Sequence, residues 1–380
     1  MSWRLLPGLV AILCALALGA PAQAAACLLV GRGAGLRVTG LRAVIALAQE
    51  DDLTLHAHLQ VAYAGAERGE PLGLVLPVPP GGAVLTSERA EKAALEELSA
   101  LTEATDPMVI PPMPSCGGCG PAVLAPPSPT GAERWDSSEF GPYAYLHVRR
   151  IEDVDAWAER WGFELSFALR EAARSQLRGG GEVLLVAKEQ VYDASGAFRP
   201  IEVSAEGAAA TVPLSWAAGC LASPAELLVF LTAQTGVEVS GPYASRRLDT
   251  LDPQLFASGP VTEPVYLELN RKEGRAVLVT ELSLPFAELS DRAFFVDETG
   301  ASLPTVAHGR PWLTRVHGYV DSETAAGDPL FEPSAGVPRV SGIIDQRSDL
   351  RAHGATIASG PSGQALLVLL ILALFRRHRR

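Results

Sequence analysis

Apolar and polar residues alternate along much of this chain, which is typical of β-strands that bury one face. The clearest alternation covers residues 53–63. One face of this segment carries Leu53, Leu55, Ala57, Leu59, Val61 and Tyr63, and the other carries Thr54, His56, His58 and Gln60. A second apolar-rich segment, Leu41–Gln49, precedes it across Glu50-Asp51-Asp52, so the two predict a β-hairpin. Similar patterns predict strands at 72–79, 143–149, 182–190, 201–204, 211–215, 226–232, 265–270 and 276–281.

Three segments have a helical pattern instead. Residues 87–103 follow a possible N-cap at Thr86 or Ser87, and they carry an apolar stripe of Ala94, Leu95, Leu98 and Leu101. Residues 151–161 and 163–177 predict two more helices, which are separated at Gly162 and end at Gly179-Gly180-Gly181. Because strands outnumber helices, we predict an α+β fold.

The N-terminus has the three-part layout of a secretory signal peptide. Arg4 precedes an apolar stretch from about Leu9 to Leu18, and Ala22 and Ala24 fit an A-x-A cleavage site. We therefore expect residues 1–24 to be a signal peptide and the rest of the chain to be exported.

The C-terminus has a short apolar segment followed by basic residues. Ala365–Phe375 would span only about 16 Å as a helix, whereas a bilayer core is about 30 Å thick. Extending the segment upstream to Ala355 reaches a spanning length but includes Pro361. The expected membrane-anchor residues are Leu366, Leu367, Leu369, Leu370, Ile371, Leu372 and Phe375. The positive-inside cluster is Arg376, Arg377, Arg379 and Arg380.

This tail also resembles the C-terminal sorting signals of Gram-negative bacteria of the PEP-CTERM and MYXO-CTERM types. It has neither the PEP motif nor the cysteine of the MYXO type. The resemblance implies a membrane protease as a partner and transfer towards the cell surface. Both retention and cleavage of the tail stay open.

The region between the two ends is longer than one core usually covers. We expect a β-rich, two-lobed body of mostly antiparallel strands with a few helices. The predicted divisions are a signal peptide (1–24), a β-rich lobe with one helix and a Pro/Cys loop (25–150), a second α+β lobe (151–317), a Pro/Gly-rich stalk (318–363) and the anchor or sorting tail (364–380).

Composition indicates a globular and acidic protein. Hydrophobic residues make up 48% of the chain and charged residues 19%, and the formal net charge is −12. Nucleic acids and anionic lipids reward basic patches, so the acidic body argues against nucleic acid as a partner.

Four cysteines follow the signal peptide: Cys27, Cys116, Cys119 and Cys220, which allow three pairings. Export favours disulfides. The stretch PPMPSCGGCGP could hold a structural disulfide, a redox pair or half of a zinc site. We expect Cys116 to pair with Cys119, which leaves Cys27 and Cys220 to pair if the fold brings them together. Cys27 also follows Ala24-Ala25-Ala26, a weak lipobox, so its lipidation is an alternative.

The sequence does not point to catalytic residues or to a cofactor. It has no H-E-x-x-H, G-x-S-x-G, Walker lysine or calcium-loop motif. His147, His308, His317 and His353 are scattered, and Glu152, Asp153 and Asp155 stand at the start of a helix, where carboxylates favour the dipole. His56 and His58 could chelate a metal from one sheet face, but no third ligand is identifiable.

Several of these segments together resemble the bacterial DUF2330 family from about residue 27 to about residue 285. The similarity lies in the hairpin followed by LGLVLPVP, the Thr102–Pro107 stretch, the cysteine loop, and the segments DVDAWAERWGFEL, EVLLVAKEQ and FRPIEVSAEGAAATVPLSW. The resemblance implies an exported, often membrane-tethered protein and implies no activity.

Two classes of function follow. We expect a non-enzymatic cell-envelope protein, in the periplasm or at the cell surface, which is attached to the membrane by its tail and binds a protein or glycan ligand or has a structural role. The alternative is an envelope hydrolase or redox protein. A pocket that gathers a histidine, a carboxylate and a Ser or Cys would favour an enzyme, whereas dispersed histidines would favour binding.

Overall fold

The computed structural model describes residues 25–32, 35–49, 53–85, 98, 133–138, 141–252, 255, 263–289, 310–325 and 327–341, and the fold below concerns these residues. The strands are β1 (Leu29–Gly31), β2 (Arg37–Ala46), β3 (Thr54–Ala64), β4 (Leu72–Val78), β5 (Ala83–Leu85), β6 (Glu133–Ser138), β7 (Gly141–Val148), β8 (Glu182–Lys188), β9 (Ser195–Ala197), β10 (Ile201–Glu206), β11 (Ala210–Thr211), β12 (Leu221–Ala233), β13 (Val237–Ser240), β14 (Ala244–Arg247), β15 (Val277–Pro285), β16 (Trp312–Val320), β17 (Leu330–Pro333) and β18 (Val340–Ser341). The α-helices are α3 (Ile151–Trp161), α4 (Phe167–Arg178), α5 (Leu214–Ala217), α6 (Glu263–Glu273) and α7 (Phe286–Leu289), and the 3₁₀-helices are η1 (Ala218–Cys220) and η2 (Leu248–Thr250).

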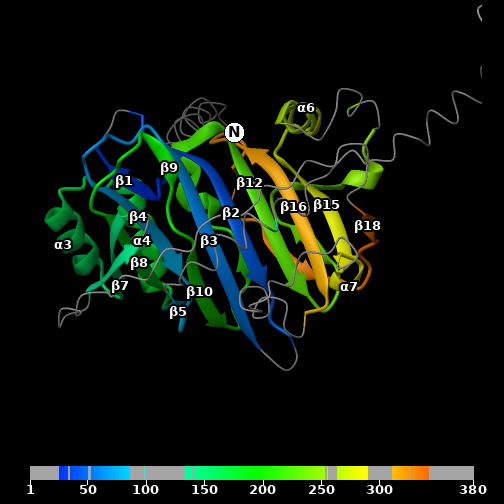
Figure 1. Cartoon of the computed structure of the whole chain (residues 1–380), viewed down its shortest axis with the longest axis horizontal. Helices are drawn as coiled ribbons and strands as arrows, with labels where there is room; N and C mark the ends of the chain where they lie inside the picture. The colour runs from blue at the N-terminus through cyan, green and yellow to red at the C-terminus, as the bar shows by residue number, and fades with distance from the viewer. Residues whose placement is uncertain are drawn as a thin grey trace, which may run out of the picture.

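The strands form three sheets (Figure 1). The large sheet has the order β14-β15-β16-β12-β2-β3-β10-β5, with β18 on β15 and β9 on β3. The second sheet has the order β1-β4-β8-β7-β6, and the third has the order β11-β17-β13. Only the β2–β12 and β14–β15 pairs are parallel among these ladders, so the predicted β-rich and mostly antiparallel fold is confirmed.

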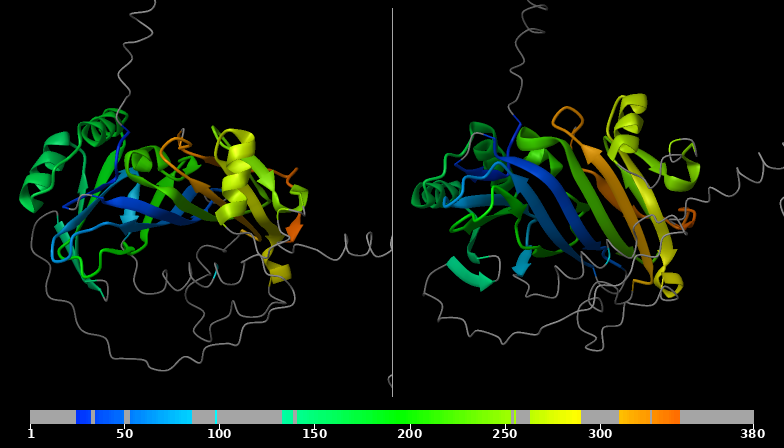
Figure 2. Two further views of the ribbon diagram at one scale, coloured as in Figure 1. Left: turned by 90° about the horizontal axis from the view of Figure 1, so that it is seen from above. Right: turned by 45° about the horizontal axis from the view of Figure 1, so that its top comes forward.

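The main core lies between the large sheet and the two smaller ones. We call the face of the large sheet that contributes to this core its inner face; Leu41, Val61 and Val229 belong to it. Strand β8 is buried along its whole length, because the large sheet covers one of its faces and α3 and α4 pack on the other. Figure 2 shows α3 and α4 at one end of the molecule and α6 beside β15 and β16 at the other.

The opposite, outer face of the large sheet has two smaller clusters. Val44, Phe230 and Leu313 form one together with Leu98, which is the one described residue of the predicted 87–103 helix and is helical. Tyr266 and Leu269 of α6 form the other with Val277 and Val279 of β15. As the alternation predicted, Leu55 and Val61 of β3 face the main core while His56 and His58 lie on the outer face, paired across the ladder with Ala46 and Val44.

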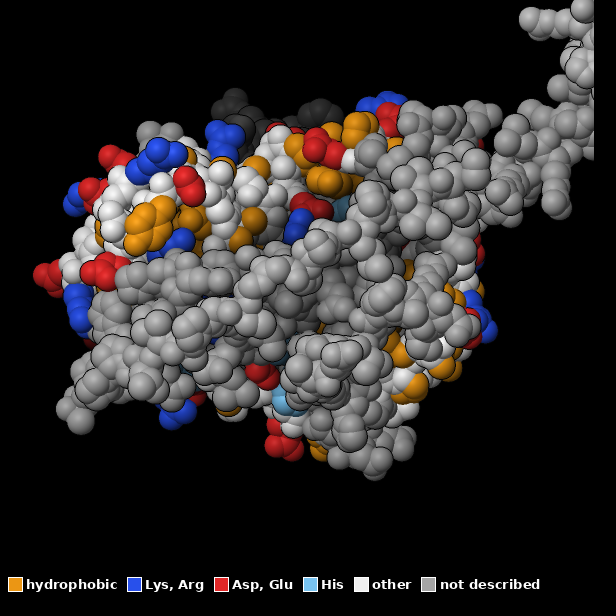
Figure 3. All heavy atoms as spheres, in the orientation of Figure 1, with side chains coloured by type: hydrophobic (Ala, Val, Ile, Leu, Met, Phe, Trp, Pro, Cys, Tyr) orange, Lys and Arg blue, Asp and Glu red, His pale blue; other side chains and the backbone are white. Residues whose placement is uncertain are grey.

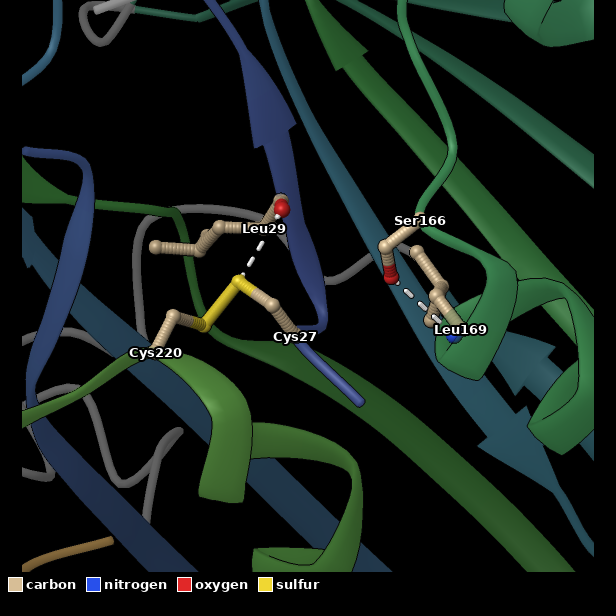
Figure 4. Close-up of a disulfide and its surroundings, with 5 residues drawn as sticks. All are labelled: Cys27, Leu29, Ser166, Leu169 and Cys220. Carbon is tan, nitrogen blue, oxygen red and sulfur yellow. Dashed lines mark hydrogen bonds between the residues drawn. A yellow bond between two sulfur atoms is a disulfide. The ribbon is translucent and has the colours of Figure 1, made fainter. Parts of the chain in front are cut away.

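A disulfide ties the first described residues to the rest of the fold. The sulfur atoms of Cys27 and Cys220 are 2.02 Å apart, and their Cα atoms are 5.1 Å apart. Figure 4 shows the bond between the segment that leads into β1 and the turn before β12, with the Cys27 sulfur 3.2 Å from the Leu29 carbonyl oxygen. The Gly219 amide donates to the Ala26 carbonyl oxygen at 2.7 Å next to this bond. A sulfur held in a disulfide cannot carry a thioether-linked lipid, so this bond and lipidation at Cys27 exclude each other.

Three segments depart from the sequence-based prediction of strands. Residues 211–215 were expected as one strand, but β11 ends at Thr211, and Leu214 and Ser215 lie in helix α5. Residues 265–270 were expected as a strand and lie within helix α6, where Val265, Tyr266 and Leu269 are buried at a helical spacing. Strand β16 was not predicted, because Arg315 and His317 are buried in it and break the usual apolar alternation.

The predicted divisions of the body also change. Each of the two larger sheets takes strands from both sides of residue 150, so the chain does not fold as two lobes divided there. Part of the predicted stalk belongs to the body, because β16 extends to Val320, β17 pairs with β11 and β13, and β18 pairs with β15. Strands β17 and β18 are short and their partners are distant in sequence, so no local periodicity marks them.

Both ends of the chain, 1–24 and 342–380, lie outside the described residues. Within the described ranges, no helix combines the length and the apolar character needed to cross a membrane.

We expect Gly73→Ala to destabilise the protein by about 1–3 kcal/mol, because overpacked cores cost that much. An added Cβ at Gly73 would lie 2.5 Å from Val30, 2.7 Å from Phe163 and 2.8 Å from Trp157, between β4 and the side chains that cover it. Urea unfolding measures the change. Gly179→Ala is the matched control, since its Cβ would meet nothing closer than 3.4 Å, and an equal loss in both variants would contradict this packing.

Candidate functional site

The largest group of interacting charged side chains in the described part of the chain lies on the outer face of the large sheet. Arg42 (β2), Glu226 (β12), Arg315 and His317 (β16) and Glu281 (β15) come from four neighbouring strands; we call them the ion network. Its inner members are buried, with Glu281 2% and Arg315 5% exposed, whereas the side chain of Arg42 is 40% exposed. Figure 3 shows basic, acidic and histidine side chains next to one another near the centre of the visible face.

A β-bulge places Glu281 in the network. The ladder between β15 and β16 shifts register here, with Thr280 opposite Val316 and Leu282 opposite Arg315. Glu281 is the extra residue, and a bulge of this kind redirects a side chain. Its carboxylate therefore reaches the outer face beside Arg315.

The Glu281 carboxylate is held from three sides. Arg315 Nε lies 2.8 Å from its Oε2, and His317 Nδ1 lies 3.2 Å from its Oε1. The hydroxyl of Tyr266 in α6 donates a hydrogen bond to the same Oε1. Since an unpaired buried charge costs several kcal/mol, these contacts make the burial of the carboxylate tolerable and attach α6 to the sheet.

The Glu226 carboxylate forms the outer half of the network. Arg42 donates to its Oε2 from Nε at 3.2 Å and from Nη2 at 2.9 Å. His317 Nε2 is 3.4 Å from its Oε1, a distance and direction that suit an ion pair better than a linear hydrogen bond. The His317 ring thus lies between two carboxylates, one at each ring nitrogen.

These contacts change the pKa values of the network. Burial alone would lower the pKa of His317, but contacts with Glu226 and Glu281 raise it above its ordinary value. The contact with His317, opposed by burial and assisted by Arg42, lowers the pKa of Glu226 to about 2. Burial would raise the pKa of Glu281, and its contacts with His317 and Arg315 outweigh this and lower it.

Aromatic rings enclose the imidazole. The ring centroid of His317 lies 4.8 Å from that of Tyr266 and 5.4 Å from that of Tyr319. Burial first, and then the nearby carboxylates, raise the pKa of Tyr319 to about 12, so this phenol stays protonated at neutral pH. In its protonated form the ring carries a proton on each nitrogen, and each nitrogen faces a carboxylate, so the protonated ring has no lone pair with which to act as a base. The ion network and Tyr266 therefore hold four strands and helix α6 together.

The other described histidines lie on two different sheets, with His56 and His58 on β3 of the large sheet and His147 on β7 of the second sheet. His147 Nε2 on β7 lies 2.7 Å from Glu182 Oε2, whose other oxygen accepts from Arg149 Nε at 2.6 Å. His56 Nδ1 is 3.6 Å from Glu202 Oε1 on β10, and His58 is 7% exposed on the same face of β3. Within the described ranges, no group of three or more His, Cys, Asp or Glu side chains is placed to hold a metal ion, and so no third ligand joins His56 and His58 there.

The remaining predicted site residues fall into two groups. The structure joins Cys27 and Cys220, the pair that was left once Cys116 and Cys119 were assigned to each other. Cys116, Cys119 and all anchor and arginine residues of the tail lie outside the described residues. Glu281 and Arg315 were not predicted from the sequence as site residues, and His317 was predicted to have no role. An Arg and a His two residues apart within WLTRVHGYV were a usable signal for a charged strip on one strand face.

An apolar hollow is the other candidate binding feature. It has a volume of about 210 Å³ and lies between the ends of β2 and β3 and the strands β11 and β17. Its lining is Leu47, Ala48, Leu55, Ala208, Ala209, Ala210, Leu330, Phe331, Glu332 and Pro333. Leu330 is 38% exposed at its rim, so apolar surface faces solvent there.

Comparisons with known proteins do not assign this chain to a family. No protein-family model matches it, and no curated protein is significantly similar to it. A solved structure that it resembles weakly is the crystal structure of baculovirus P35, with a TM-score of 0.26 and 8% identity over 59% of this chain and 68% of that one. A TM-score this low does not establish a shared fold.

We expect exchange of His317 for glutamine to lower stability by about 1.5–3 kcal/mol, the usual contribution of a hydrogen bond to a charged group, and to do so in a limited pH window. The raised pKa of His317 means that its contribution is complete below about 6.5 and is lost as pH rises through the folded-state value. The lowered pKa of Glu226 means that its contribution is complete above about 4.5 and is lost as pH falls towards about 2.

The difference between wild type and His317→Gln should therefore be largest between about pH 4.5 and 6.5, as measured by urea unfolding at a series of pH values. Glu226→Gln serves as the second variant and should weaken the acid-side decline, while the part due to Glu281, whose pKa is also lowered, should remain. A difference that stays constant from acidic to alkaline pH would show that the imidazole is not held as a cation.

Proposed function

We propose that this chain is an exported cell-envelope protein that acts without catalysis, as a binding or structural module. The observation that carries the proposal is the arrangement of His317 between Glu226 and Glu281, which commits the chemically richest group of the described residues to holding strands and helix together. The hydrogen bonds and ion pairs of this imidazole go to carboxylates and not to a Ser or Cys nucleophile. The wide separation of His56, His147 and His317 over β3, β7 and β16 also favours binding over acid–base chemistry.

The disulfide supports export. Cys27 stands three residues after the predicted signal peptide, and its bond to Cys220 joins positions 193 residues apart. Such bonds persist in oxidising compartments and are rare in the cytosol. In this proposal residues 1–24 direct secretion, and the fold is completed outside the cytoplasm, in the periplasm or at the cell surface.

The tail would then supply the attachment. Leu366–Phe375 and the arginines from Arg376 onward act as a short anchor with the basic residues on the cytoplasmic side, or as a signal for a sorting protease. The sequence segments that resemble the DUF2330 family imply the same location. The ligand of the body is a protein or a glycan, and the apolar hollow beside β17 is its proposed contact surface. The acidic composition argues against nucleic acid.

Deletion of residues 364–380 should release the protein from the membrane into the soluble exported fraction, because the remaining body lacks the proposed anchor. Cell fractionation with immunoblotting measures the distribution. The matched control replaces the apolar run alone with a polar run of equal length and should give the same release. Continued membrane retention of the deleted protein would overturn attachment through the tail.

We expect peptide mapping of the exported protein without reductant to show two links, Cys27 to Cys220 and Cys116 to Cys119. The long-range bond should account for about 2–5 kcal/mol, since removing a native disulfide typically costs this much. The double variant Cys27→Ser/Cys220→Ser should show this loss in urea unfolding, and Cys116→Ser/Cys119→Ser should show much less, because its loop is short. A link from Cys27 or Cys220 to Cys116 or Cys119 would contradict the assignment.

A further inference from the structure

Lysine is rare in this chain, and one of the few lysines is buried. The chain has 31 lysines and arginines, and the lysines among them are Lys92, Lys188 and Lys272. Lys188 is 7% exposed at the end of β8. Arginine stays charged in any protein environment, whereas a buried lysine can lose its proton. A lysine at this position therefore permits chemistry that arginine would not.

Two tyrosines from different sheets enclose the Lys188 amine. Its Nζ lies 5.9 Å from the ring centroid of Tyr63 on β3 and 5.8 Å from that of Tyr143 on β7, and 3.5 Å from the Tyr63 hydroxyl oxygen. Tyr63 is 2% exposed and Tyr143 is fully buried. We call Tyr63 and Tyr143 the tyrosine cage; it holds the amine between the large sheet and the second sheet.

No carboxylate of the described residues forms an ion pair with this amine. Asp193 acts on it from a greater distance, is 76% exposed and pairs with Arg68 at 3.4 Å. Burial lowers the pKa of Lys188, and the charge of Asp193 opposes this only in part. Burial also raises the pKa of both tyrosines, with buried Arg199 acting in the opposite direction on Tyr143, so the cage offers neutral hydroxyls and ring faces.

We propose that Lys188 is a nucleophilic amine that captures a small aldehyde or ketone as a reversible imine. The lone pair of the neutral Nζ attacks the carbonyl carbon and forms a C–N bond. Two hydrogens of the amine then leave with the carbonyl oxygen as water, so that the C–O bonds break and a C=N bond remains; hydrolysis reverses the reaction. No oxidant or reductant is needed. The Tyr63 hydroxyl oxygen accepts a hydrogen bond from Nζ at 3.5 Å, and in this proposal the same hydroxyl donates its proton to the carbonyl oxygen of the ligand.

Burial restricts the ligand to small carbonyl compounds. Lys188 is 7% exposed and both cage tyrosines are buried, so we expect only a carbonyl compound of a few heavy atoms to react with the amine. The site is separate from the ion network and does not depend on the tail. Whether or not Lys188 forms an imine therefore has no bearing on the proposed envelope function.

Reductive alkylation of the exported wild-type protein with acetaldehyde and cyanoborohydride tests the proposal, with peptide mass spectrometry to follow each lysine across a pH series. Lys272 is the internal control, because its side chain is 51% exposed and its amine pairs with Glu268 at 3.6 Å. The alkylation rate of Lys188 should reach half of its own maximum at a lower pH than that of Lys272.

Two variants sharpen the test. Lys188→Arg should abolish labelling of that peptide and leave the Lys272 rate unchanged, and Tyr63→Phe should slow labelling at residue 188 alone. The pH dependence of Lys188 alkylation in the wild-type protein tests the proposal even if a variant does not fold. Equal pH midpoints for Lys188 and Lys272, or labelling of Lys188 only in denaturant, would overturn the proposal and leave Lys188 as a packing residue.

Discussion

The carboxylate of Glu281 is buried in the outer face of the large sheet, and much of the surrounding architecture follows from the need to pair it. A buried ion without partners would cost more than most single packing contacts contribute. Arg315 and His317 on the neighbouring strand supply positive charge, and Tyr266 brings helix α6 into contact with the sheet. The imidazole then lies against a second carboxylate, which Glu226 provides, and Arg42 pairs with that carboxylate nearer the surface. The network thus links β2, β12, β16, β15 and α6.

The large sheet has different neighbours on its two faces. Its inner face packs against the smaller sheets through a continuous apolar core, in which any residue of suitable size and shape is tolerated. Its outer face combines two small apolar clusters with charged side chains, and ion pairs demand specific partners at specific positions. The inner face therefore contributes most of the buried apolar side chains, while the ion pairs of the outer face join β2, β12, β16 and β15.

The buried basic side chains of this molecule have two different kinds of surroundings. In the ion network each cation meets a carboxylate, so its charge is stabilised and its chemistry is suppressed. At Lys188 the neighbours are rings and a phenol hydroxyl, which stabilise an ammonium group less well than a carboxylate does. This contrast underlies the structural role proposed for the network and the reactivity proposed for the amine.

The sequence by itself determined the local features of this protein. Strict alternation in β3 specified which side chains face the core, and the helical pattern of residues 151–161 gave the bounds of α3 as the structure has them. Such features depend on the period of the backbone alone. The sequence by itself did not determine which distant segments pair with one another. The parallel pairing of β2 with β12 joins segments more than 180 residues apart, and the Cys27–Cys220 bond spans a similar separation.

The ion network shows most clearly what only the tertiary structure decided. Residues 265–270 had the composition of a strand and became part of α6, because the helix buries Tyr266 and Leu269 against β15 and β16. The bulge at Glu281 produces no recognisable periodicity in the sequence. Burial of the Glu281 carboxylate is stabilised by Arg315 and His317, which are more than 30 residues away. Burial of a charge is favourable only when its partners are in place, and their positions are a property of the assembled sheet.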